Sequence, residues 1–394
     1  MGKPKVSVIL ASYNHEEFVG KAIESVISQS FKDWELIIID DCSKDGSVDV
    51  IKQYKDSRIQ FFEAKVNKGP ILTFNELMEK AQGDYIAILG SDDIWYQNKL
   101  QVQIEYMEKN NEIAVCFSHV EFIDENGIVY SHDKDCDMQI NVFNQRNRNQ
   151  GECFYYFFLN GNFFCHPSSV IRRSVVDEIG GFDLRFRQLH DYYYWIKILQ
   201  KYPVYVVQEP LVLYRRIYKN DKSVSAGTAL NSIRLLNEIQ VITFEMIRDM
   251  DLRCFVDAFS KLLRKPIDNE VQLICEKYFV LLQWRIWGYN NIQPAIWYID
   301  NYINNTKFRT CMEKEYGYSL NDYYVEKART IKIYPLEFNE EHKKILEKNQ
   351  NLIREKTRDI ESLNNEIEEM RNTISWKITK PLRNLKGVGK TDEY

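Results

Sequence analysis

The sequence lacks a pairing pattern among its cysteines, a signal peptide and a long hydrophobic run. Its eight cysteines are scattered, with no Cys-x-x-Cys pair and no Cys/His spacing that would close a zinc site. We interpret them as reduced thiols packed in the interior of a cytoplasmic protein. The strand-like run Val6–Leu10 follows Met1 so closely that no secretory signal fits, and no stretch reaches the roughly 18 apolar residues of a membrane-spanning helix. We therefore expect a protein that is neither secreted by a signal peptide nor integral to a membrane.

The sequence also has no excess of positive charge. With 52 basic and 57 acidic residues its formal net charge is −5, so it lacks the basic footprint of a nucleic-acid-binding domain. Hydrophobic residues make up 44% of the chain and charged residues 28%, which is typical of a folded globular protein. Its 394 residues are enough for two or three domains. We expect a globular protein without a polynucleotide partner.

Short apolar runs alternate with helix-periodic segments over the first 110 residues or so. The runs Val6–Leu10, Glu35–Ile39 and Tyr85–Leu89 are continuous, as expected for strands that are covered on both faces. Between the first two runs, Val19, Ile23 and Val26 fall on one helical face. This alternation predicts an α/β fold with βαβ units and a mostly parallel sheet flanked by helices.

Polar residues follow each of these three runs. The segments are Ala11-Ser-Tyr-Asn14, Asp40-Asp41 and Gly90-Ser-Asp92-Asp93. Asp and Asn favour turns and helix caps whatever the function, but three such ends at one edge of a parallel sheet indicate a ligand site. Hard cations such as Mg²⁺ and Mn²⁺ take oxygen ligands, so Asp92-Asp93 is a candidate metal site. An Asp-Asp pair after a strand is common and is weak evidence by itself.

Composition divides the chain into four segments. Residues 1–222 hold all the strand-like runs, including Ala114–Ser118, Val204–Val207 and Leu211–Tyr214, and a helix that starts near Asp191. Residues 223–335 are rich in helix-forming sequence and predict a helical accessory domain. Residues 336–375 predict a coiled coil or long amphipathic helix, and residues 376–394 a basic tail.

The C-terminal segments indicate possible partners. Apolar residues recur at a spacing of three and four among charged residues, which is typical of a helix that self-associates: Leu346, Ile353, Ile360, Leu363, Ile367, Met370 and Ile374. Six basic and no acidic residues then follow between Arg371 and Lys390, with Trp376 among them. This pattern suits peripheral attachment to an anionic membrane surface, and a solvated basic tail is the alternative.

Four motifs in the first half of the chain resemble those of family 2 glycosyltransferases of the GT-A fold, in the same order and at the same spacing. They are Val6-Ser-Val-Ile-Leu-Ala-Ser-Tyr-Asn14, Glu35-Leu-Ile-Ile-Ile-Asp-Asp-Cys-Ser-Lys-Asp-Gly-Ser47, Asn67-Lys-Gly69 and Gly83-Asp-Tyr-Ile-Ala-Ile-Leu-Gly-Ser-Asp-Asp-Ile-Trp95. The resemblance continues through His166-Pro-Ser-Ser-Val-Ile-Arg172, Gly180-Gly-Phe-Asp183 and His190-Asp191, and so covers about the first 220 residues.

The resemblance implies an inverting, nucleotide-sugar-dependent enzyme that is assisted by Mn²⁺ or Mg²⁺. It implies that a UDP-type donor is bound by Ala11, Tyr13, Asn14, Asp41, Asn67, Gly69 and Asp92. Asp41 would accept hydrogen bonds from a uracil-like edge, Asp93 would bind the metal, and Asp191 would be the general base, although Asp191 also suits a helix N-cap. Candidates for acceptor binding or an auxiliary role are Trp95, His166, His190 and Arg216.

Three positions depart from the family pattern. Gly90 and His190 stand where many relatives carry an acid, and Tyr218 stands where a His is common. We expect an enzyme that adds a sugar to a bacterial-type surface glycan or its lipid-linked precursor. The alternative suggested by Gly90 and His190 is a degenerate glycan-binding or scaffold protein. A nucleotidyltransferase is disfavoured, because no Gly-rich phosphate loop follows the first strand.

Overall fold

The computed structural model describes residues 2–130, 142–216, 229–286 and 291–330. Residues Met1–Glu326 form one compact unit. The predicted boundary at residue 222, Tyr218, the predicted coiled coil and the predicted basic tail lie outside the described residues. No helix in the described part of the chain is both long and apolar enough to cross a membrane.

An eight-stranded sheet with strand order β3-β2-β1-β4-β7-β6-β8-β5 organises the first half of the chain. Its strands are β1 (Val6–Ser12), β2 (Trp34–Asp40), β3 (Ile59–Glu63), β4 (Tyr85–Gly90), β5 (Ile94–Trp95), β6 (Val115–Ile123), β7 (Val170–Arg172) and β8 (Val204–Arg215). Strands β1 to β4 pair in parallel, whereas β7 is antiparallel to β4 and β6, and β5 is antiparallel to β8. The expected α/β fold with a mostly parallel sheet is confirmed.

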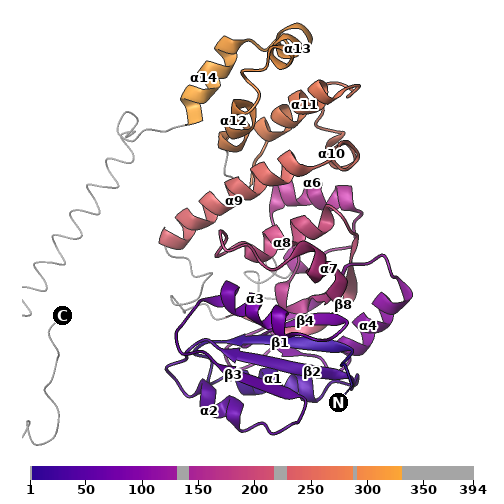
Figure 1. Ribbon diagram of the computed structural model, residues 1–394, viewed down its shortest axis with the longest axis vertical. Helices are drawn as coiled ribbons and strands as arrows, with labels where there is room; N and C mark the ends of the chain where they lie inside the picture. The colour runs from indigo at the N-terminus through magenta and orange to yellow at the C-terminus, as the bar shows by residue number, and fades with distance from the viewer. Residues whose placement is uncertain (1, 131–141, 217–228, 287–290, 331–394) are drawn as a thin grey trace, which may run out of the picture. The chain divides into compact units, whose positions relative to one another are not determined.

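Both faces of the sheet are covered, as the continuous apolar runs predict. On β1, Val8 and Leu10 pack with helix α1 in one core cluster, and Ile9 packs with helix α3 in the other. The helices of this half are α1 (Val19–Ile27), α2 (Ser47–Lys52), α3 (Pro70–Lys80), α4 (Lys99–Lys109), α6 (Gln150–Asn160), α7 (Arg173–Ile179) and α8 (His190–Leu199), with a 3₁₀ turn at His166–Ser168. Figure 1 shows α1 and α2 on one side of β1 and β2 and α3 on the other.

The described residues after residue 228 form a helical region, as predicted. Its helices are α9 (Ala229–Asp249), α10 (Leu252–Phe259), α11 (Glu270–Leu282), α12 (Gln293–Asp300), α13 (Thr306–Tyr316) and α14 (Leu320–Thr330). Asp251, Asn269 and Asn305 cap α10, α11 and α13 through side-chain oxygens that accept main-chain N–H bonds. The side chains of these helices belong to the same core cluster as one face of the sheet.

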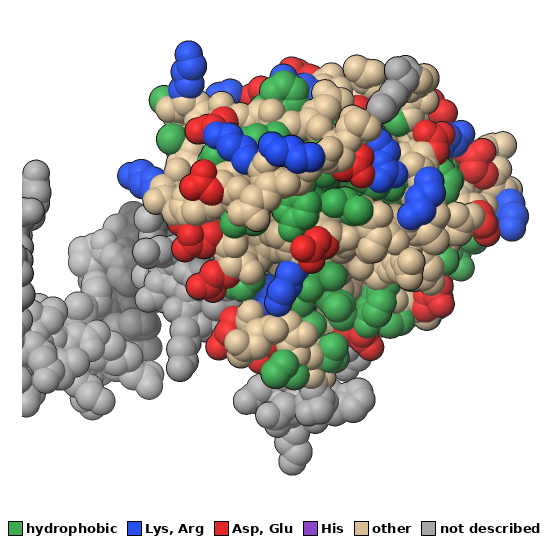
Figure 2. Space-filling model, turned by 90° about the horizontal axis from the view of Figure 1, so that it is seen from below, with side chains coloured by type: hydrophobic (Ala, Val, Ile, Leu, Met, Phe, Trp, Pro, Cys, Tyr) green, Lys and Arg blue, Asp and Glu red, His purple; other side chains and the backbone are tan. Residues whose placement is uncertain are grey.

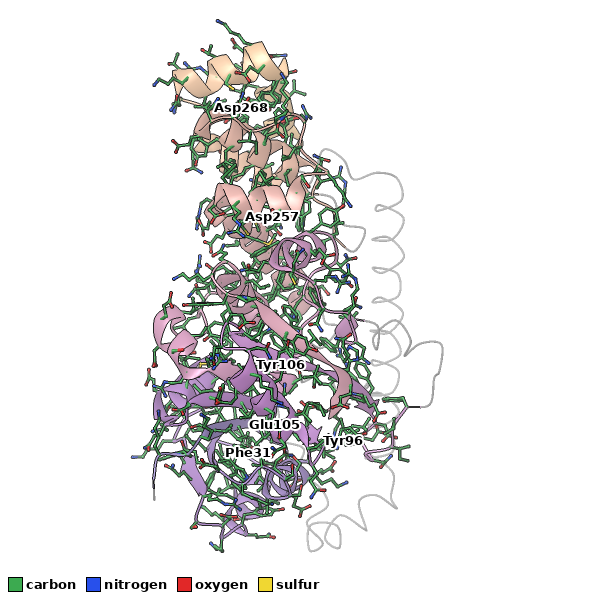
Figure 3. All side chains as sticks on the ribbon, turned by 90° about the vertical axis from the view of Figure 1, so that its right-hand side faces the viewer. Phe31, Tyr96, Glu105, Tyr106, Asp257 and Asp268 are labelled. Carbon is green, nitrogen blue, oxygen red and sulfur yellow. The ribbon has the colours of Figure 1, made fainter. Side chains whose placement is uncertain are left out.

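Figure 3 shows this continuity, with the side chains of the helical part around Asp257 and Asp268 and those of the sheet part around Phe31 and Tyr106. Helices α6 and α10 pack closely, and Gly151 of α6 lies against Asp257 of α10. A Cβ atom at Gly151 would lie 2.8 Å from the Asp257 carbonyl carbon. On the face seen in Figure 2, basic and acidic side chains are interspersed and neither sign dominates.

Candidate active site

The carboxyl ends of three parallel strands lie at one level of the sheet. Ala11 on β1 is paired in register with Ile39 on β2 and with Gly90 on β4, and Ser12 is paired with Asp40. The polar segments that follow β1, β2 and β4 therefore leave the sheet side by side. This is the edge at which open α/β sheets bind ligands.

The acidic pair Asp92-Asp93 forms a tight turn between β4 and β5. The main-chain N–H of Asp93 donates to the Gly90 carbonyl over 3.1 Å, and strand β5 then pairs with β8. This pairing brings Arg215 beside the turn, where its main-chain N–H donates to Oδ1 of Asp93 over 2.8 Å. Gly90 provides the space for this arrangement, because a Cβ atom there would lie 2.3 Å from Oδ2 of Asp93.

The Asp93 side chain is buried, at 3% exposure. Burial, and then the neighbouring Asp92 carboxylate, raise the pKa of Asp93 well above its ordinary value. The Arg215 guanidinium donates to the main-chain carbonyls of Asp92, Asp124 and Glu125, and the charges of Arg215 and Arg216 oppose this shift only in part. Two adjacent carboxylates, one of them buried, suit a divalent cation. Among the described residues, no group of three or more His, Cys, Asp or Glu side chains could hold a metal.

The segment after β2 is fixed by Asp41, which is 4% exposed. Its two carboxylate oxygens accept the main-chain N–H groups of Lys68 and Gly69, each over 2.8 Å. Asn67 donates from its side chain to the Asp41 carbonyl over 3.0 Å. Gly69 has a φ of 84°, which favours glycine. Asp41, Asn67 and Gly69, for which the resemblance implies donor binding, are thus brought together by hydrogen bonds within the loop.

The segment after β1 is more open. Tyr13 is 41% exposed, and Asn14 adopts a φ of 53° while its Oδ1 accepts the main-chain N–H of Lys44. The next residue, His15, bonds through Nδ1 to Oγ of Ser91 over 2.7 Å and ties this segment to the acidic turn. No local pattern predicts this contact of His15, because it joins segments that are distant in the chain.

A cleft of about 320 Å³ lies at this edge, within the range of small-molecule sites. Six predicted residues line it: Ala11, Asp92, Asp93, His166, His190 and Asp191. Residues that were not predicted as ligand contacts also line it: Phe74, Ile88, Gly90, Ser91, Pro167, Gln188 and Tyr214. The other predicted residues, Tyr13, Asn14, Asp41, Asn67, Gly69, Trp95 and Arg216, are not among its lining residues.

Two of the residues predicted for the acceptor side lie behind the cleft. Trp95 is 3% exposed, and its indole N–H donates to the carbonyl of Pro167, which itself lines the cleft. The guanidinium of Arg216 lies 5.2 Å from the ring centroid of Tyr214, another lining residue. Both residues therefore support the wall of the cleft in this structure.

Asp191 lies in the first turn of α8 and faces the cleft. Its carboxylate accepts the main-chain N–H of Tyr192 over 2.8 Å and the side-chain amide of Asn162 over 3.0 Å. Burial raises the pKa of Asp191 above its ordinary value, and the adjacent His190 and these two hydrogen bonds oppose the shift. Asn162 follows α6 and was not predicted, because its contact with Asp191 joins segments that are distant in sequence.

Two histidines stand beside Asp191 in the cleft wall. The rings of His166 and His190 meet edge to face at 5.6 Å, and Phe182 packs against both. Burial, and then His190, lower the pKa of His166 well below its usual value, so this ring is neutral. Within the described structure, Nε2 of each histidine is buried without a hydrogen-bond partner.

Known proteins of one family are similar to this chain in sequence. Residues 7–180 match the family model described as glycosyl transferase family 2. An uncharacterised glycosyltransferase of Methanocaldococcus jannaschii is 34% identical over 220 residues, which are 55% of this chain and 72% of that protein. The Escherichia coli enzyme UDP-Glc:alpha-D-GlcNAc-diphosphoundecaprenol beta-1,3-glucosyltransferase WfgD is 34% identical over 196 residues, which are 50% of this chain and 70% of that enzyme.

A solved structure shares the fold at low sequence identity. Residues 1–349 of S. aureus TarS, in complex with UDP-GlcNAc, superpose with a TM-score of 0.51 and 16% identity over 82% of this chain and 91% of that one. The chain belongs to the family 2 glycosyltransferases. It is therefore an enzyme that transfers a sugar from a nucleotide-sugar donor.

Proposed function

We propose that this glycosyltransferase is an inverting, metal-assisted enzyme that transfers a sugar from a UDP-sugar to a hydroxyl of a glycan or lipid-linked glycan. The observation that carries the proposal is that one cleft is lined both by the pair Asp92-Asp93 and by Asp191. Charge neutralisation on the departing diphosphate and proton removal from the acceptor are the two tasks of such a transfer. The cleft holds a candidate for each.

The acidic turn is the candidate holder of Mn²⁺ or Mg²⁺. Asp93 would bind the cation, and Asp92 would lie against the donor ribose or diphosphate. Both cations commonly use only one or two protein carboxylates together with phosphate oxygens and water, which suits a site with two acidic side chains. When bound, the cation would stabilise the negative charge of the leaving nucleoside diphosphate as a Lewis acid. The main-chain N–H of Arg215 orients Asp93 for this role.

Asp191 is the candidate general base. Its carboxylate would take the proton of the acceptor hydroxyl while the hydroxyl oxygen forms a bond to the anomeric carbon of the donor. The bond from that carbon to the diphosphate oxygen breaks in the same step, and the diphosphate leaves with the electron pair. A single displacement of this kind inverts the configuration at the anomeric carbon. Asn162 and the main-chain N–H of Tyr192 hold the carboxylate in position.

The donor and acceptor classes rest on the chain's relatives. The E. coli relative is named for UDP-glucose as donor and a diphosphoundecaprenol-linked sugar as acceptor. The loop segments with Tyr13 and Asp41 would hold the uracil and ribose beside the cleft. The test is UDP release from a panel of UDP-sugars with Mn²⁺, with and without added acceptors. Absence of turnover with every donor, and of metal-dependent UDP binding, would rule out the proposal.

The pH dependence of transfer should report the protonation of Asp191. Because burial raises the pKa of Asp191, the acid limb of kcat/KM should lie above pH 3.8. The hydrogen bond from Asn162 opposes this shift, so Asn162→Ala should move the limb to higher pH. Asn160→Ala serves as the control, because Asn160 bonds to Tyr156 in its own helix. If the acid limb lies at the same pH in Asn162→Ala and in wild type, the limb reports the protonation of a group other than Asp191.

The space at Gly90 should be essential to the acidic turn. Gly90→Ala would place a methyl group against the buried Asp93 carboxylate, so that Asp93 must move. A displacement of about 1 Å at a catalytic group can lower the reaction rate by roughly a hundredfold. We therefore expect kcat/KM to fall by about tenfold to a hundredfold. Steady-state kinetics and the melting temperature of the same samples would separate this effect from unfolding. A variant with wild-type kcat/KM would show that Asp93 tolerates the shift.

A further inference from the structure

Helix α9 presents a buried carboxylate to the loop that leads into α8. Oε1 of Glu238 accepts the main-chain N–H of Arg187, and Oε2 accepts those of Gln188 and Leu189, each over 2.9 Å. Glu238 is 6% exposed. The segment it holds ends directly before His190, where α8 begins, and Asp191 is the second residue of that helix. A side chain of the helical region thus orders the approach to the candidate base.

These three hydrogen bonds are strong for a physical reason. A carboxylate that accepts N–H bonds in a buried setting makes charge-assisted hydrogen bonds, and a negative charge near a helix N-terminus is stabilised by the helix dipole. No Lys or Arg side chain pairs with Glu238 among the ion pairs of the described residues. Its negative charge is therefore balanced by the three main-chain N–H groups and the start of α8.

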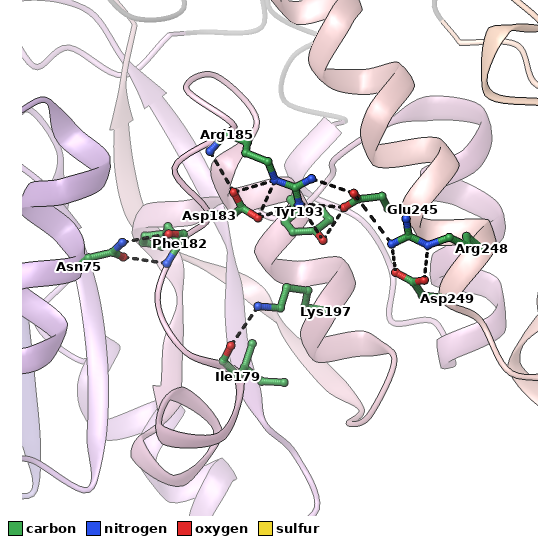
Figure 4. A network of polar contacts seen from close by, with 10 residues as sticks. All are labelled: Asn75, Ile179, Phe182, Asp183, Arg185, Tyr193, Lys197, Glu245, Arg248 and Asp249. Carbon is green, nitrogen blue, oxygen red and sulfur yellow. Dashed lines mark hydrogen bonds and ion pairs between the residues drawn. The ribbon is translucent and has the colours of Figure 1, made fainter. Parts of the chain in front are cut away.

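A second contact from α9 fastens the same loop (Figure 4). The guanidinium of Arg185 donates to both oxygens of Glu245, over 2.8 and 3.0 Å, and also binds Asp183. The hydroxyl of Tyr193 on α8 donates to Glu245 over 2.7 Å. Glu238 and Glu245 are seven residues apart, so they lie two turns apart on the same face of α9. One face of α9 holds both the loop and α8.

The C-terminal end of α9 is anchored within the helical region. Lys277 of α11 donates from Nζ to the main-chain carbonyls of Arg248, over 2.9 Å, and Met250, over 2.5 Å, where α9 ends. Gln188 and His190, on either side of the end of the loop, both line the cleft. Contacts inside the helical region therefore fix α9, and α9 in turn fixes part of the cleft wall.

We propose that Glu238 is a positioning residue for Asp191, and that helix α9 is consequently part of the catalytic unit. The proposal rests on the role of Asp191 in the proposed function. Glu238 does not contact the reacting atoms. It sets the path of residues 187–189 and through them the first turn of α8, which must hold the Asp191 carboxylate at a fixed place in the cleft.

The test compares Glu238→Gln with a matched change at Glu276. Glu276 is also a buried carboxylate of the helical region, fully unexposed, and it accepts the main-chain N–H groups of Arg264 and Lys265 over 2.8 and 2.9 Å. Glu276→Gln therefore removes the same kind of charge-assisted hydrogen bonds from a loop that does not lead to the cleft. Both variants are made in the full chain, and Glu238→Asp, which keeps the charge but withdraws it by one methylene, is a second variant should Glu238→Gln fail to fold.

We expect Glu238→Gln to lower kcat for transfer by about tenfold to a hundredfold while the dissociation constant for UDP with Mn²⁺ changes by less than about twofold. Glu238→Asp should give a smaller loss in the same direction. Glu276→Gln should lower the melting temperature without lowering kcat of the folded enzyme. Equal kcat in Glu238→Gln, Glu238→Asp and wild type, or an equal fall in kcat for Glu276→Gln, would overturn the proposal.

A further variant separates this inference from the proposed function. If Asp191→Asn retains transfer, the proposed role of Asp191 is wrong and Glu238 has no base to position. If Asp191→Asn abolishes transfer while the Glu238 variants match wild type, the proposed function stands and the positioning role alone fails. In the Asp191→Asn enzyme, Glu238→Gln should cause little further loss in the residual rate, because both changes act through one group.

Discussion

Asp191→Asn should lower kcat for sugar transfer by about a thousandfold while leaving the affinity for UDP and Mn²⁺ close to that of wild type. General base catalysis raises the rate by roughly a hundredfold to ten-thousandfold, and asparagine cannot take up the proton of the acceptor hydroxyl. Asparagine keeps the size of the side chain and an oxygen that can accept the main-chain N–H of Tyr192, so the first turn of α8 should stay in place. Single-turnover transfer and calorimetric UDP binding would measure the two quantities separately.

The matched control is Asp177→Asn, which removes a carboxylate from a surface ion pair with Arg173 on α7. An exposed pair of this kind contributes little to stability, and it lies on a different helix from Asp191. We expect wild-type kcat from this variant. If kcat for transfer by Asp191→Asn is within tenfold of the wild-type value, another group in the cleft removes the proton. The neighbouring His190 would then be the first residue to mutate.

Asp93→Asn should abolish the response of donor turnover to Mn²⁺, with a fall in kcat/KM of about a thousandfold. Removal of one group that stabilises the charge formed in the transition state commonly lowers kcat by roughly a hundredfold to a thousandfold. Here Asp93 would supply the charged ligand of the cation. The comparison is Asp92→Asn, which should weaken donor binding but keep the dependence on Mn²⁺. Turnover measured against Mn²⁺ concentration, and UDP affinity with and without Mn²⁺, would distinguish the two variants.

The same substitution should not lower the melting temperature. Asp93 is 3% exposed and lies beside Asp92, so its negative charge is unfavourable in the folded protein without a cation. Asparagine removes that charge and keeps an oxygen that can accept the main-chain N–H of Arg215. A metal-independent loss of stability in Asp93→Asn would mean that the carboxylate is primarily a structural group. Retained sensitivity to Mn²⁺ would place the metal elsewhere.

The parts of the site that the sequence predicts are those fixed by local patterns. A continuous apolar run followed by polar residues locates the end of a buried strand, and this applies to β1, β2 and β4. The helix predicted to start near Asp191 begins at His190. The resemblance to the family then supplied the roles of Asp92, Asp93 and Asp191, all of which line the cleft.

The parts that the sequence does not predict depend on register and on contacts between distant segments. Arg216 was one of four residues predicted for acceptor binding or an auxiliary role. Its neighbour Arg215, which was not predicted, bonds to the acidic turn, because the pairing of β5 with β8 decides which main-chain N–H meets Asp93. The two strands predicted at Val204–Val207 and Leu211–Tyr214 form the single strand β8. Likewise, no local pattern shows that Gly90 leaves room for Asp93 or that Glu238 holds the loop before α8.

The order in which the chain is synthesised gives the contact at Glu238 a further consequence. Glu238 follows Leu189 by 49 residues, and the last strand of the sheet ends at Arg215, so the whole sheet is made before α9. At about 5–20 residues per second, Glu238 is synthesised several seconds after the loop that it will hold. The acidic turn can therefore form on the nascent chain before Glu238 holds residues 187–189. Asp191 takes its final position in the cleft only when α9 folds against that loop.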